Sequence, residues 1–178
     1  VVGGGNTAMD AARTAVRLGA GTVTVLYRRT RREMPCLMAE VEAAEAEGVR
    51  LETLIAPVRL ERVAQGGLRL TCVRMQLGKP DASGRPRPEP IPGSEFTLFA
   101  SSVVAAIGQV VDSAGLDAGD LRLSRNGIVA DPQTLETSLA GVFAGGDGVT
   151  GADLAIRAVA AGTLAAVSID QYLSGRRV

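Results

Sequence analysis

Residues 1–8 read VVGGGNTA, and this stretch decides the fold class. Its last six residues have the form G-x-G-x-x-A, after two valines and before a run with helical apolar spacing. In such a loop Gly3 allows a tight turn, Gly5 lets the backbone approach a pyrophosphate, and Ala8 lets the helix pack on the strand. The helix N-terminus attracts phosphate through its N–H groups and its dipole. Asn6 and Thr7 are candidates to cap this helix and to touch the same ligand.

The pattern that follows alternates between helix and strand. Residues 6–19 and 36–47 have apolar residues at helical spacing, and each run is stopped by a glycine. The short β-rich runs 22–27 and 49–55 are typical of buried strands. The N-terminal 55 residues therefore predict β-α-β-α-β, an α/β fold with a Rossmann-like parallel sheet. The opening strand is shorter than the ~5 residues that are usual, so we expect it to be truncated and the chain to be a fragment.

Beyond residue 55 the pattern changes to alternating strands. Residues 57–64 and 68–77 flank a Gln-Gly-Gly turn, which predicts an antiparallel β-hairpin insertion. Residues 78–95 contain five prolines and are predicted to form an exposed loop. Strands are expected at 96–99 and at 102–107, and the second is apolar after Ser102 and therefore expected to be buried.

The C-terminal part is predicted to be a portion of a second domain. After an irregular polar segment, short strands are expected at 127–131 and 141–144, followed by a long helix over 152–173. We place the domain boundary between residues 109 and 110, which gives domains of 1–109 and 110–178.

Composition narrows the possible functions. Lys plus Arg and Asp plus Glu both number 19 in 178 residues, so net charge gives no reason to expect nucleic acid or a membrane as partner. The sequence has no histidine, which excludes Ser-His-Asp hydrolysis, Cys-His catalysis and His-ligated metal. Cys36 and Cys72 form no C-x-x-C motif; we expect two plain reduced residues in a cytoplasmic protein.

The end of the second predicted strand indicates which dinucleotide is preferred. NAD sites place a carboxylate here, on the ribose 2′-hydroxyl. Residues 28–32 instead read RRTRR, with no acid. Guanidinium groups suit a 2′-phosphate, so Arg28 and Arg29 favour NADP(H). The alternative is a solvated basic turn.

A second glycine motif lies near the C-terminus. Residues 137–147 read TSLAGVFAGGD, a short apolar strand that ends in Gly-Gly-Asp before a small-residue turn and the long helix. Asp147 at such a position can accept hydrogen bonds from ligand hydroxyls, and the helix N-terminus beyond it can stabilise negative charge. The alternative is that Asp147 only forms the turn.

Together these motifs resemble the flavoproteins that have two dinucleotide-binding domains. The segments GGGNTAMD at 3–10, YRR at 27–29 with Met34-Pro35, and AAIGQ at 105–109 are most similar to the small (β) subunit of NADPH-dependent glutamate synthase. The resemblance implies that NADPH gives a hydride to FAD and that electrons then pass through iron–sulfur clusters to a partner subunit or fused domain. The FAD-domain glycine loop and the cluster-binding cysteines of that family would lie outside this chain.

The resemblance also implies roles for individual residues. The NADPH phosphates would be held by Gly3, Gly5, Asn6, Thr7 and Ala8, and the 2′-phosphate by Arg28 and Arg29. Gly108 and Gln109 would lie where the nucleotide domain returns to the FAD domain. FAD would be bound by Gly146 and Asp147 and, near the flavin pyrimidine edge, by Leu154, Ala155 and Ile156.

The sequence departs from the family patterns at two places, and two other functions are possible interpretations. Leu154 stands where the family often has threonine, so a backbone N–H would have to serve there. The arginine spacing differs from the H-R-R-x-x-x-R pattern of thioredoxin reductases. The chain could instead be an inactive nucleotide-binding module or scaffold. A dehydrogenase that acts directly on a small substrate is less favoured, because such an enzyme usually needs a residue that transfers a proton and this sequence has no histidine.

Overall fold

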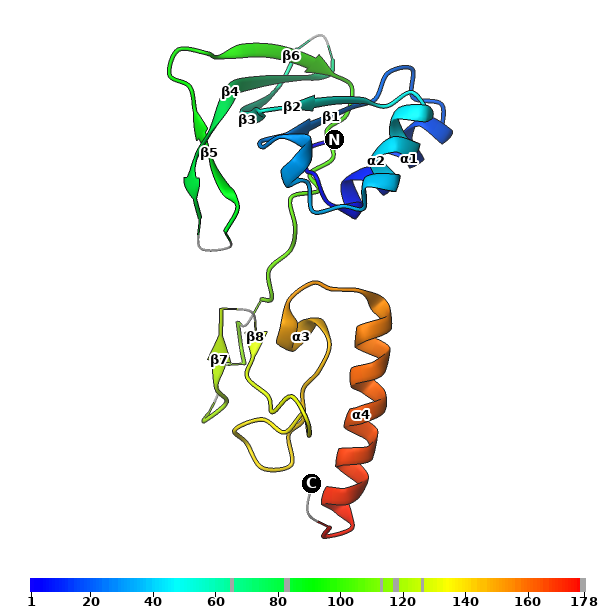
Figure 1. Ribbon diagram of the computed structural model, residues 1–178, viewed down its shortest axis with the longest axis vertical. Coiled ribbons are helices and arrows are strands. Elements are labelled where there is room, and N and C mark those ends of the chain that lie inside the picture. Colours follow the sequence, from blue (N-terminus) through cyan, green and yellow to red (C-terminus); the bar gives the residue numbers. More distant parts are fainter. Residues whose placement is uncertain (65, 82–83, 113, 117–118, 126, 177–178) are drawn as a thin grey trace. The chain divides into compact units, whose positions relative to one another are not determined.

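The computed structural model describes the chain except residues 65, 82–83, 113, 117–118, 126 and 177–178. The chain divides into two compact units, Val1–Gly108 and Gln109–Val178 (Figure 1).

A parallel sheet forms the middle layer of the first unit. Strand β1 (Thr24–Tyr27) pairs in parallel with β2 (Arg50–Thr53). Val2 forms parallel bridges to Leu26 of β1 and to Ala105. The resulting order is β2, β1, Val2, Ala105. This arrangement confirms the Rossmann-like parallel sheet in the first part of the chain.

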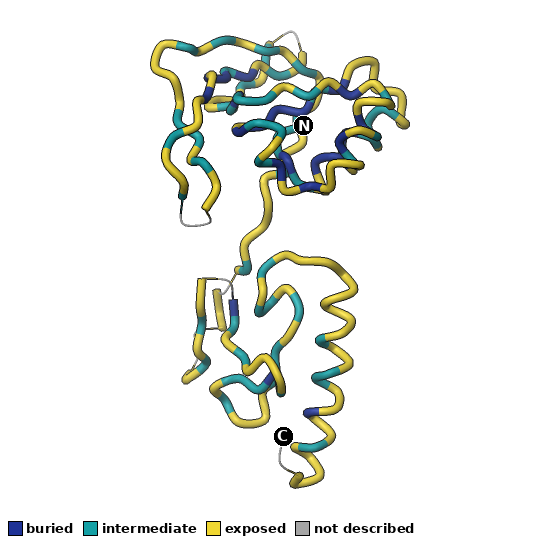
Figure 2. Tube along the Cα trace, in the orientation of Figure 1, coloured by how far each residue is buried: buried dark blue, intermediate teal, exposed yellow. Residues whose placement is uncertain are grey.

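Two helices cross over between these strands and cover one face of the sheet. They are α1 (Asn6–Arg17) and α2 (Met38–Ala46), with a short 3-10 helix, η1 (Arg31–Glu33), before α2. Alternation along β1 turns Val25 and Tyr27 toward these helices, in one cluster of buried side chains. Leu26 points to the opposite face and joins a second cluster. Figure 2 shows this buried layer in dark blue.

An antiparallel sheet covers the other face. Its central strand is β4 (Leu68–Pro80), which pairs with β3 (Ile55–Arg62), β5 (Pro86–Pro90) and β6 (Phe96–Ala100). The predicted β3–β4 hairpin is confirmed. Ile55, predicted to end the preceding parallel strand, instead begins β3. The chain turns at Leu54, which has a φ of 56°. A positive φ is uncommon for leucine, so the sequence does not predict a turn at this residue.

The proline-rich segment 78–95 was predicted to be a loop, and this prediction is wrong over 78–80, where β4 continues, and over 86–90. There the chain forms β5, paired with the second half of β4. The N–H of Ile91 donates to the carbonyl of Arg74. Because backbone groups alternate in direction along a strand, the odd-numbered residues of β5 direct their N–H and C=O groups toward β4. Pro86, Pro88 and Pro90 therefore occupy the positions whose missing N–H would point away from the ladder. Prolines at such positions are compatible with an edge strand.

The apolar run 102–107 was predicted to be a buried strand, and this is also wrong. Only Ala105 forms a bridge, to Val2, while Val104 and Ile107 are 45% and 76% exposed. A parallel strand is buried when layers cover both of its faces. Within the described residues of the first unit this segment has a strand neighbour on one side only.

The second unit is built around one long helix. Strands β7 (Leu123–Ser124) and β8 (Gly127–Ile128) form a small antiparallel pair, and helices α3 (Asp147–Thr150) and α4 (Ala155–Leu173) follow. The predicted strand 127–131 is reduced to β8 and a single bridge at Ala130, and 141–144 is reduced to a single bridge at Phe143. The predicted long helix begins three residues later than expected, and α3 was not predicted.

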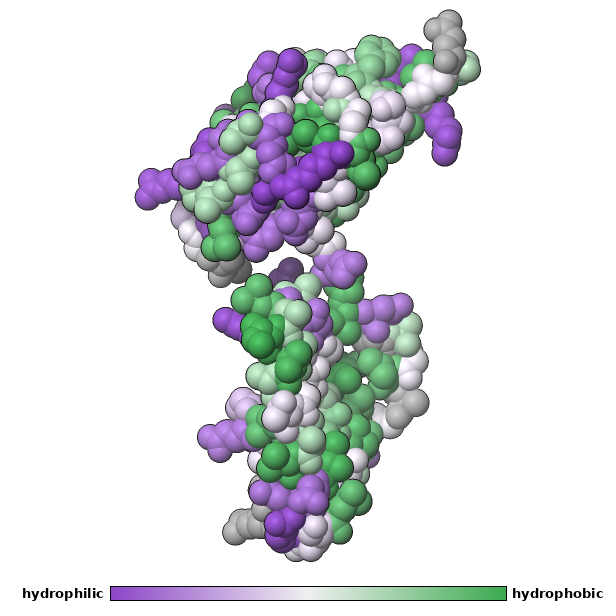
Figure 3. Space-filling model, turned by 90° about the vertical axis from the view of Figure 1, so that its right-hand side faces the viewer, coloured by the Kyte–Doolittle hydropathy of each residue, from purple (hydrophilic) through white to green (hydrophobic). Residues whose placement is uncertain are grey.

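Helix α4 leaves much of its apolar surface exposed. Its exposed large side chains include Ile156, Val159, Val167 and Leu173. Figure 3 shows apolar side chains gathered along this helix. None of the helices in the described part of the chain is long and apolar enough to cross a membrane.

Candidate nucleotide-binding site

A cleft of about 740 Å³ opens in the first unit, beside the glycine loop. Its walls come from residues 2–5, the end of β1, strand β3 and residues 103–108. The volume lies within the range of small-molecule and cofactor sites. The loop predicted to bind phosphate and the strand end predicted to select the nucleotide therefore share one cleft.

The three glycines of the loop differ in what a side chain would meet. Gly3 has a φ of 146°, and a Cβ there would lie 2.1 Å from the carbonyl oxygen of Ala106. A Cβ on Gly4 would lie 2.5 Å from the ring of Tyr27. At Gly5 the nearest atom to a Cβ would be Pro35 Cγ, at 4.0 Å. Gly3 and Gly4 thus serve packing within the protein, whereas Gly5 leaves open space in which a ligand can approach the backbone.

The N-terminus of α1 faces this open space. Gly5 is the N-cap and no side chain caps the helix, so the predicted capping by Asn6 or Thr7 is wrong. The Asn6 side-chain oxygen instead accepts the backbone N–H of Leu37, at 3.1 Å. Thr7 is exposed and lines the cleft, and Ala8 is fully buried. The N–H of Ala8 donates to the carbonyl of Gly5 at 3.0 Å. The N–H groups of Asn6 and Thr7 precede the first acceptor of the helix, which makes them suitable donors to an anion.

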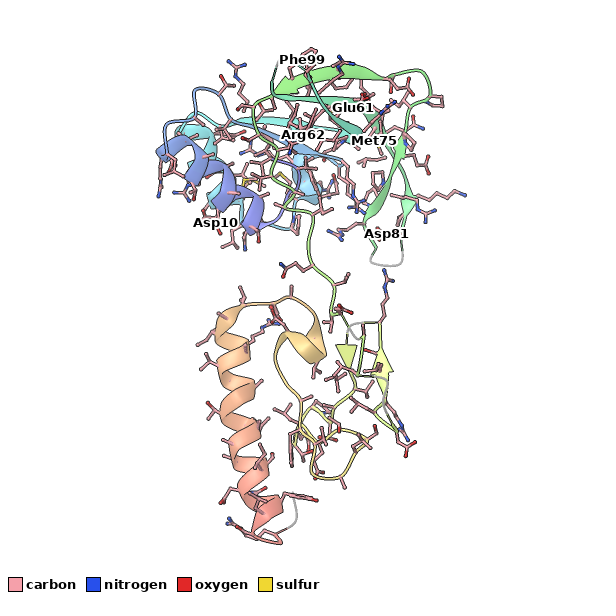
Figure 4. The ribbon with its side chains drawn as sticks, turned by 180° about the vertical axis from the view of Figure 1, so that it is seen from behind. Asp10, Glu61, Arg62, Met75, Asp81 and Phe99 are labelled. Carbon is pink, nitrogen blue, oxygen red and sulfur yellow. The ribbon has the colours of Figure 1, made fainter. Side chains whose placement is uncertain are left out.

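The two arginines at the end of β1 have different environments. Arg28 is exposed and lines the cleft. Arg29 also lines it, but its side chain is only 5% exposed and is paired with Asp81, Nη2 to Oδ2 at 2.8 Å. Its Nε donates to the carbonyl of Pro86, also at 2.8 Å. Arg29 thereby fixes the β4–β5 hairpin against the end of β1 (Asp81 is labelled in Figure 4).

The turn after these arginines is held by a capping box. Thr30 donates its backbone N–H and its hydroxyl to the Glu33 carboxylate. The hydroxyl of Thr30 is the main cause that lowers the pKa of Glu33. The buried Tyr27 donates its hydroxyl to the carbonyl of Glu33, at 2.7 Å. The spacing Thr30-x-x-Glu33 is a sequence signature of this motif and could have predicted it.

Sequence reasoning missed two further arginines of the cleft. Arg59 of β3 and Arg85 before β5 both line it, and Arg59 is paired with Glu61 at 2.8 Å. Among the described lining residues there are four arginines and no Asp or Glu. Gly108, with a φ of 99°, lines the cleft, whereas Gln109 belongs to the second unit. No local pattern marks Arg59 or Arg85, because long-range strand pairing brings them here.

A smaller cleft, of about 500 Å³, lies in the second unit. Gly146, Asp147 and Ala155 line it, beside the alanines of α4. Asp147 is exposed and begins α3. A Cβ on Gly146 would lie 3.3 Å from the Cβ of Ala158, and its φ is 62°, so the close approach of α4 and the backbone conformation both favour glycine.

A carboxylate just before α4 engages the backbone N–H of the N-cap residue, Leu154, although no side chain caps the helix. The N–H of Leu154 donates to Asp153 Oδ1 at 2.7 Å, which is the main cause that lowers the pKa of Asp153. The backbone donor that the sequence suggested at Leu154 is therefore engaged in this structure. Leu154 and Ile156 are exposed and lie outside the residues that line the smaller cleft, whereas Ala155 lines it.

Comparison of the sequence with known protein families assigns this chain to one of them. Residues 1–162 match the family described as pyridine nucleotide-disulphide oxidoreductase. The chain belongs to this family. The pyridine nucleotide-disulphide oxidoreductase family binds FAD and NAD(P)H, which is consistent with one dinucleotide motif in each unit.

Similar proteins include several β subunits and small chains. The chain is 54% identical to the NADP(+)-dependent formate dehydrogenase subunit beta of Moorella thermoacetica, over 97% of this chain and 24% of that protein. It is 45% identical to the NADPH-Fe(3+) oxidoreductase subunit beta of Geobacter sulfurreducens, over 85% and 26%. It is 41% identical to the glutamate synthase [NADPH] small chain of Azospirillum brasilense, over 99% and 37%. The resemblance to glutamate synthase small chains is confirmed.

A solved structure supports the fold. Thioredoxin reductase of T. acidophilum matches with a TM-score of 0.72 and 22% identity, over 98% of this chain and 51% of that one. At this identity the likeness shows the fold alone. The chain spans about a quarter to two fifths of the three relatives above.

Proposed function

We propose that the chain is the NADPH-binding part of an FAD-dependent oxidoreductase of the glutamate synthase small-chain type. Residues 1–109 form the NADPH domain, and residues 110–178 form the C-terminal portion of the FAD domain. The observation that carries the proposal is the cleft of the first unit, where an open glycine cradle faces arginines and, among the lining residues that the structure describes, no acid. When bound, NADPH supplies a hydride and FAD accepts it.

The glycine loop holds the pyrophosphate of the nucleotide. The first-turn N–H groups of Asn6 and Thr7 donate to its oxygens, and the open space at Gly5 allows the close approach. Gly3 and Ala8 keep the loop and α1 packed on the sheet. The dipole of α1 adds to the attraction at this end of the cleft.

The arginines at the end of β1 select the phosphorylated nucleotide. A guanidinium can form two parallel hydrogen bonds with a phosphate. NADPH carries a phosphate at the ribose 2′ position, whereas NADH carries a hydroxyl there. Exposed Arg28 is free of the close packing that surrounds Arg29, so its fork can turn toward the 2′-phosphate. Arg29 contributes charge and fixes the neighbouring hairpin.

The second unit contributes one side of an FAD site. Asp147 accepts hydrogen bonds from the ribityl–pyrophosphate region, Gly146 allows close backbone approach, and the segment Leu154, Ala155 and Ile156 faces the flavin pyrimidine edge. The exposed apolar surface of α4 supports this proposal, because a helix with such a surface is usually buried by another layer.

The electron acceptor lies outside this chain. The described residues contain no group of three or more His, Cys, Asp or Glu that could hold a metal. We therefore place the iron–sulfur clusters in another segment or in a partner, a larger oxidoreductase subunit or a fused domain. Three similar proteins are named as β subunits or small chains, which supports a partner subunit.

Calorimetry on the purified chain tests the nucleotide assignment. We expect NADPH to bind more tightly than NADH. The variant R28A should weaken NADPH binding about tenfold or more, the value of one charge-assisted hydrogen bond, and leave NADH unchanged. R32A is the matched control, since Arg32 is exposed but outside the cleft lining. Equal loss for both nucleotides would contradict the role of Arg28, and no binding of either would favour the scaffold alternative.

A further inference from the structure

The segment between η1 and α2 is tied to the glycine loop at two points. We call this segment, residues 34–37, the strap. The N–H of Cys36 donates to the carbonyl of Gly4 at 3.3 Å, and the N–H of Leu37 donates to the side-chain oxygen of Asn6 at 3.1 Å. The strap therefore runs alongside the loop that is proposed to hold the pyrophosphate.

The beginning of the strap is fixed by other contacts. The residue before it, Glu33, accepts the hydroxyl of buried Tyr27 on its carbonyl, at 2.7 Å, and the hydrogen bonds of Thr30 on its carboxylate. Loss of the Asn6 contact should therefore release the strap at its Leu37 end only and leave the rest of the fold in place.

Side chains of the strap alternate between the core and the cleft. Met34 and Cys36 are each 8% exposed and belong to the cluster of buried side chains formed by β1, α1 and α2. Pro35, between them, is exposed and lines the cleft. Its Cγ is the nearest atom to the position that a Cβ on Gly5 would take, at 4.0 Å. The proline ring is therefore one wall of the open space at Gly5.

A proline gives this wall a fixed shape. Its ring locks φ and removes a backbone N–H. Met34 before it has a φ of −65° and a ψ of 129°, the extended conformation that a following proline favours. An apolar wall also keeps water away from the hydrogen bonds beside it, and hydrogen bonds are stronger where the local dielectric constant is low. Displacement of Pro35 should therefore weaken phosphate binding at the first turn of α1.

We propose that Asn6 is a positioning residue for nucleotide binding, whose side chain holds Pro35 against the pyrophosphate through the strap. The inference rests on the NADPH-binding function proposed above. The side chain of Asn6 is engaged with Leu37, and Asn6 is absent from the described residues that line the cleft. Its backbone N–H is a separate group that remains a donor to the pyrophosphate. The side chain and the main chain of this residue therefore have different roles.

Calorimetry on the full chain with NADPH and NADH tests the inference. Both nucleotides carry the pyrophosphate, so N6A and P35A should each weaken both of them about fivefold, the value of one neutral hydrogen bond. The variant R28A, in contrast, is expected to affect NADPH alone. T14A is the matched control, because Thr14 is a neutral, exposed residue of α1 outside the described lining of the cleft.

The double variant N6A/P35A tests whether Asn6 acts through the strap. If it does, the double variant should bind each nucleotide as weakly as P35A alone, because the wall that Asn6 positions is already lost. Losses that multiply to about twenty-five-fold would show that the two residues act independently and would overturn the inference. Binding by N6A that equals that of the unaltered chain would overturn it as well.

Hydrogen exchange at the Leu37 amide, measured by NMR without a ligand, reports the contact itself. N6A should speed this exchange, and N6D should restore the protection, because aspartate keeps an oxygen acceptor at the same place. Exchange that is unchanged in N6A would contradict the role of Asn6. Circular dichroism and urea midpoints show whether each variant keeps its fold.

The outcomes separate this inference from the proposed function. If the unaltered chain binds NADPH and NADH and N6A binds them equally well, Asn6 has no such role and the proposed function stands. If the unaltered chain binds neither nucleotide, the proposed function itself fails, and the inference fails with it.

Discussion

Gly4 and Gly5 are neighbours in the phosphate loop, but a side chain at each would meet different surroundings. A methyl group at Gly4 would lie 2.5 Å from the buried ring of Tyr27, whose hydroxyl is held by Glu33. We expect G4A to lower the free energy of unfolding by about 1–3 kcal/mol, the usual cost of overpacking. Urea unfolding followed by circular dichroism measures it.

Replacement of Gly5 should affect nucleotide binding and leave the free energy of unfolding unchanged. Its nearest neighbour would be 4.0 Å away, and its φ of −91° suits alanine. We expect G5A to unfold at the same urea concentration as the unaltered chain and to bind NADPH more weakly, because the methyl group fills the space used by the pyrophosphate. A G5A chain that loses stability as G4A does would show that Gly5 serves packing and not a ligand.

For individual residues, the sequence predicted correctly those roles that depend on residues nearby in the chain. The glycine loop is a local motif, so its position beside a strand and a helix was correctly predicted. The environment of Arg29 was not, because its partner Asp81 lies 52 positions further along the chain. Gly4 was treated as a variable position, and only the ring of Tyr27 shows why glycine is needed there.

Among the elements, α1 and α2 are joined by a cluster of ion pairs. Arg13 pairs with Glu40 and Glu47, and Arg17 also pairs with Glu47. Hydrogen bonds from Arg17 and then Arg13 hold the pKa of Glu47 at about 2, below its ordinary 4.5. Because the folded state resists protonation of this carboxylate, its contribution to stability is complete above pH 4.5 and is lost as the pH falls through about 2.

The variant E47Q should therefore be less stable than the unaltered chain at pH 6. The difference should narrow as the pH falls from 4.5 through about 2, because below the folded-state pKa both chains carry a neutral side chain at this position. Urea midpoints measured across this pH range test the expectation. E42Q, at an exposed position of α2, is the control. A difference that stays constant with pH would rule out the ion pairs as its cause.

The elements themselves were predictable where periodicity and stop signals agree. Both helices and β1 of the first unit follow from apolar spacing and glycine stops. Strand β5 was missed because five prolines suggest a loop. Only the register against β4 shows that Pro86, Pro88 and Pro90 occupy the positions whose N–H would point away from the ladder. The segment 102–107 was called buried from its apolar residues alone, although burial depends on which layers cover it.

At the scale of the whole molecule, the two units differ in how much they bury. Both clusters of buried hydrophobic residues lie in the first unit, and in the described part of the second unit Leu135 is the one buried hydrophobic residue. Hydrophobic burial is the main favourable term in folding. We therefore expect the second unit to unfold at a lower temperature than the first.

The chain contains a natural reporter for each unit. It has two tyrosines, buried Tyr27 in the first unit and Tyr172 in α4, which meets Phe143 edge to face at 5.9 Å. A chain labelled with 3-fluorotyrosine should give two fluorine resonances, assigned with Y27F and Y172F. On heating, the Tyr172 signal should reach its unfolded position first. Saturating NADPH should shift the Tyr27 signal, since Tyr27 lines the cleft, and raise only the transition of the first unit.

The size of that rise follows from ligand linkage. A ligand that binds only the folded unit stabilises it by about 2.7 kcal/mol at one hundred times its dissociation constant. If the two units are energetically independent, none of this reaches Tyr172, and its transition stays in place. A single shared transition, raised equally for both tyrosines by NADPH, would show that the units fold as one and that the nucleotide cleft is coupled to the C-terminal unit.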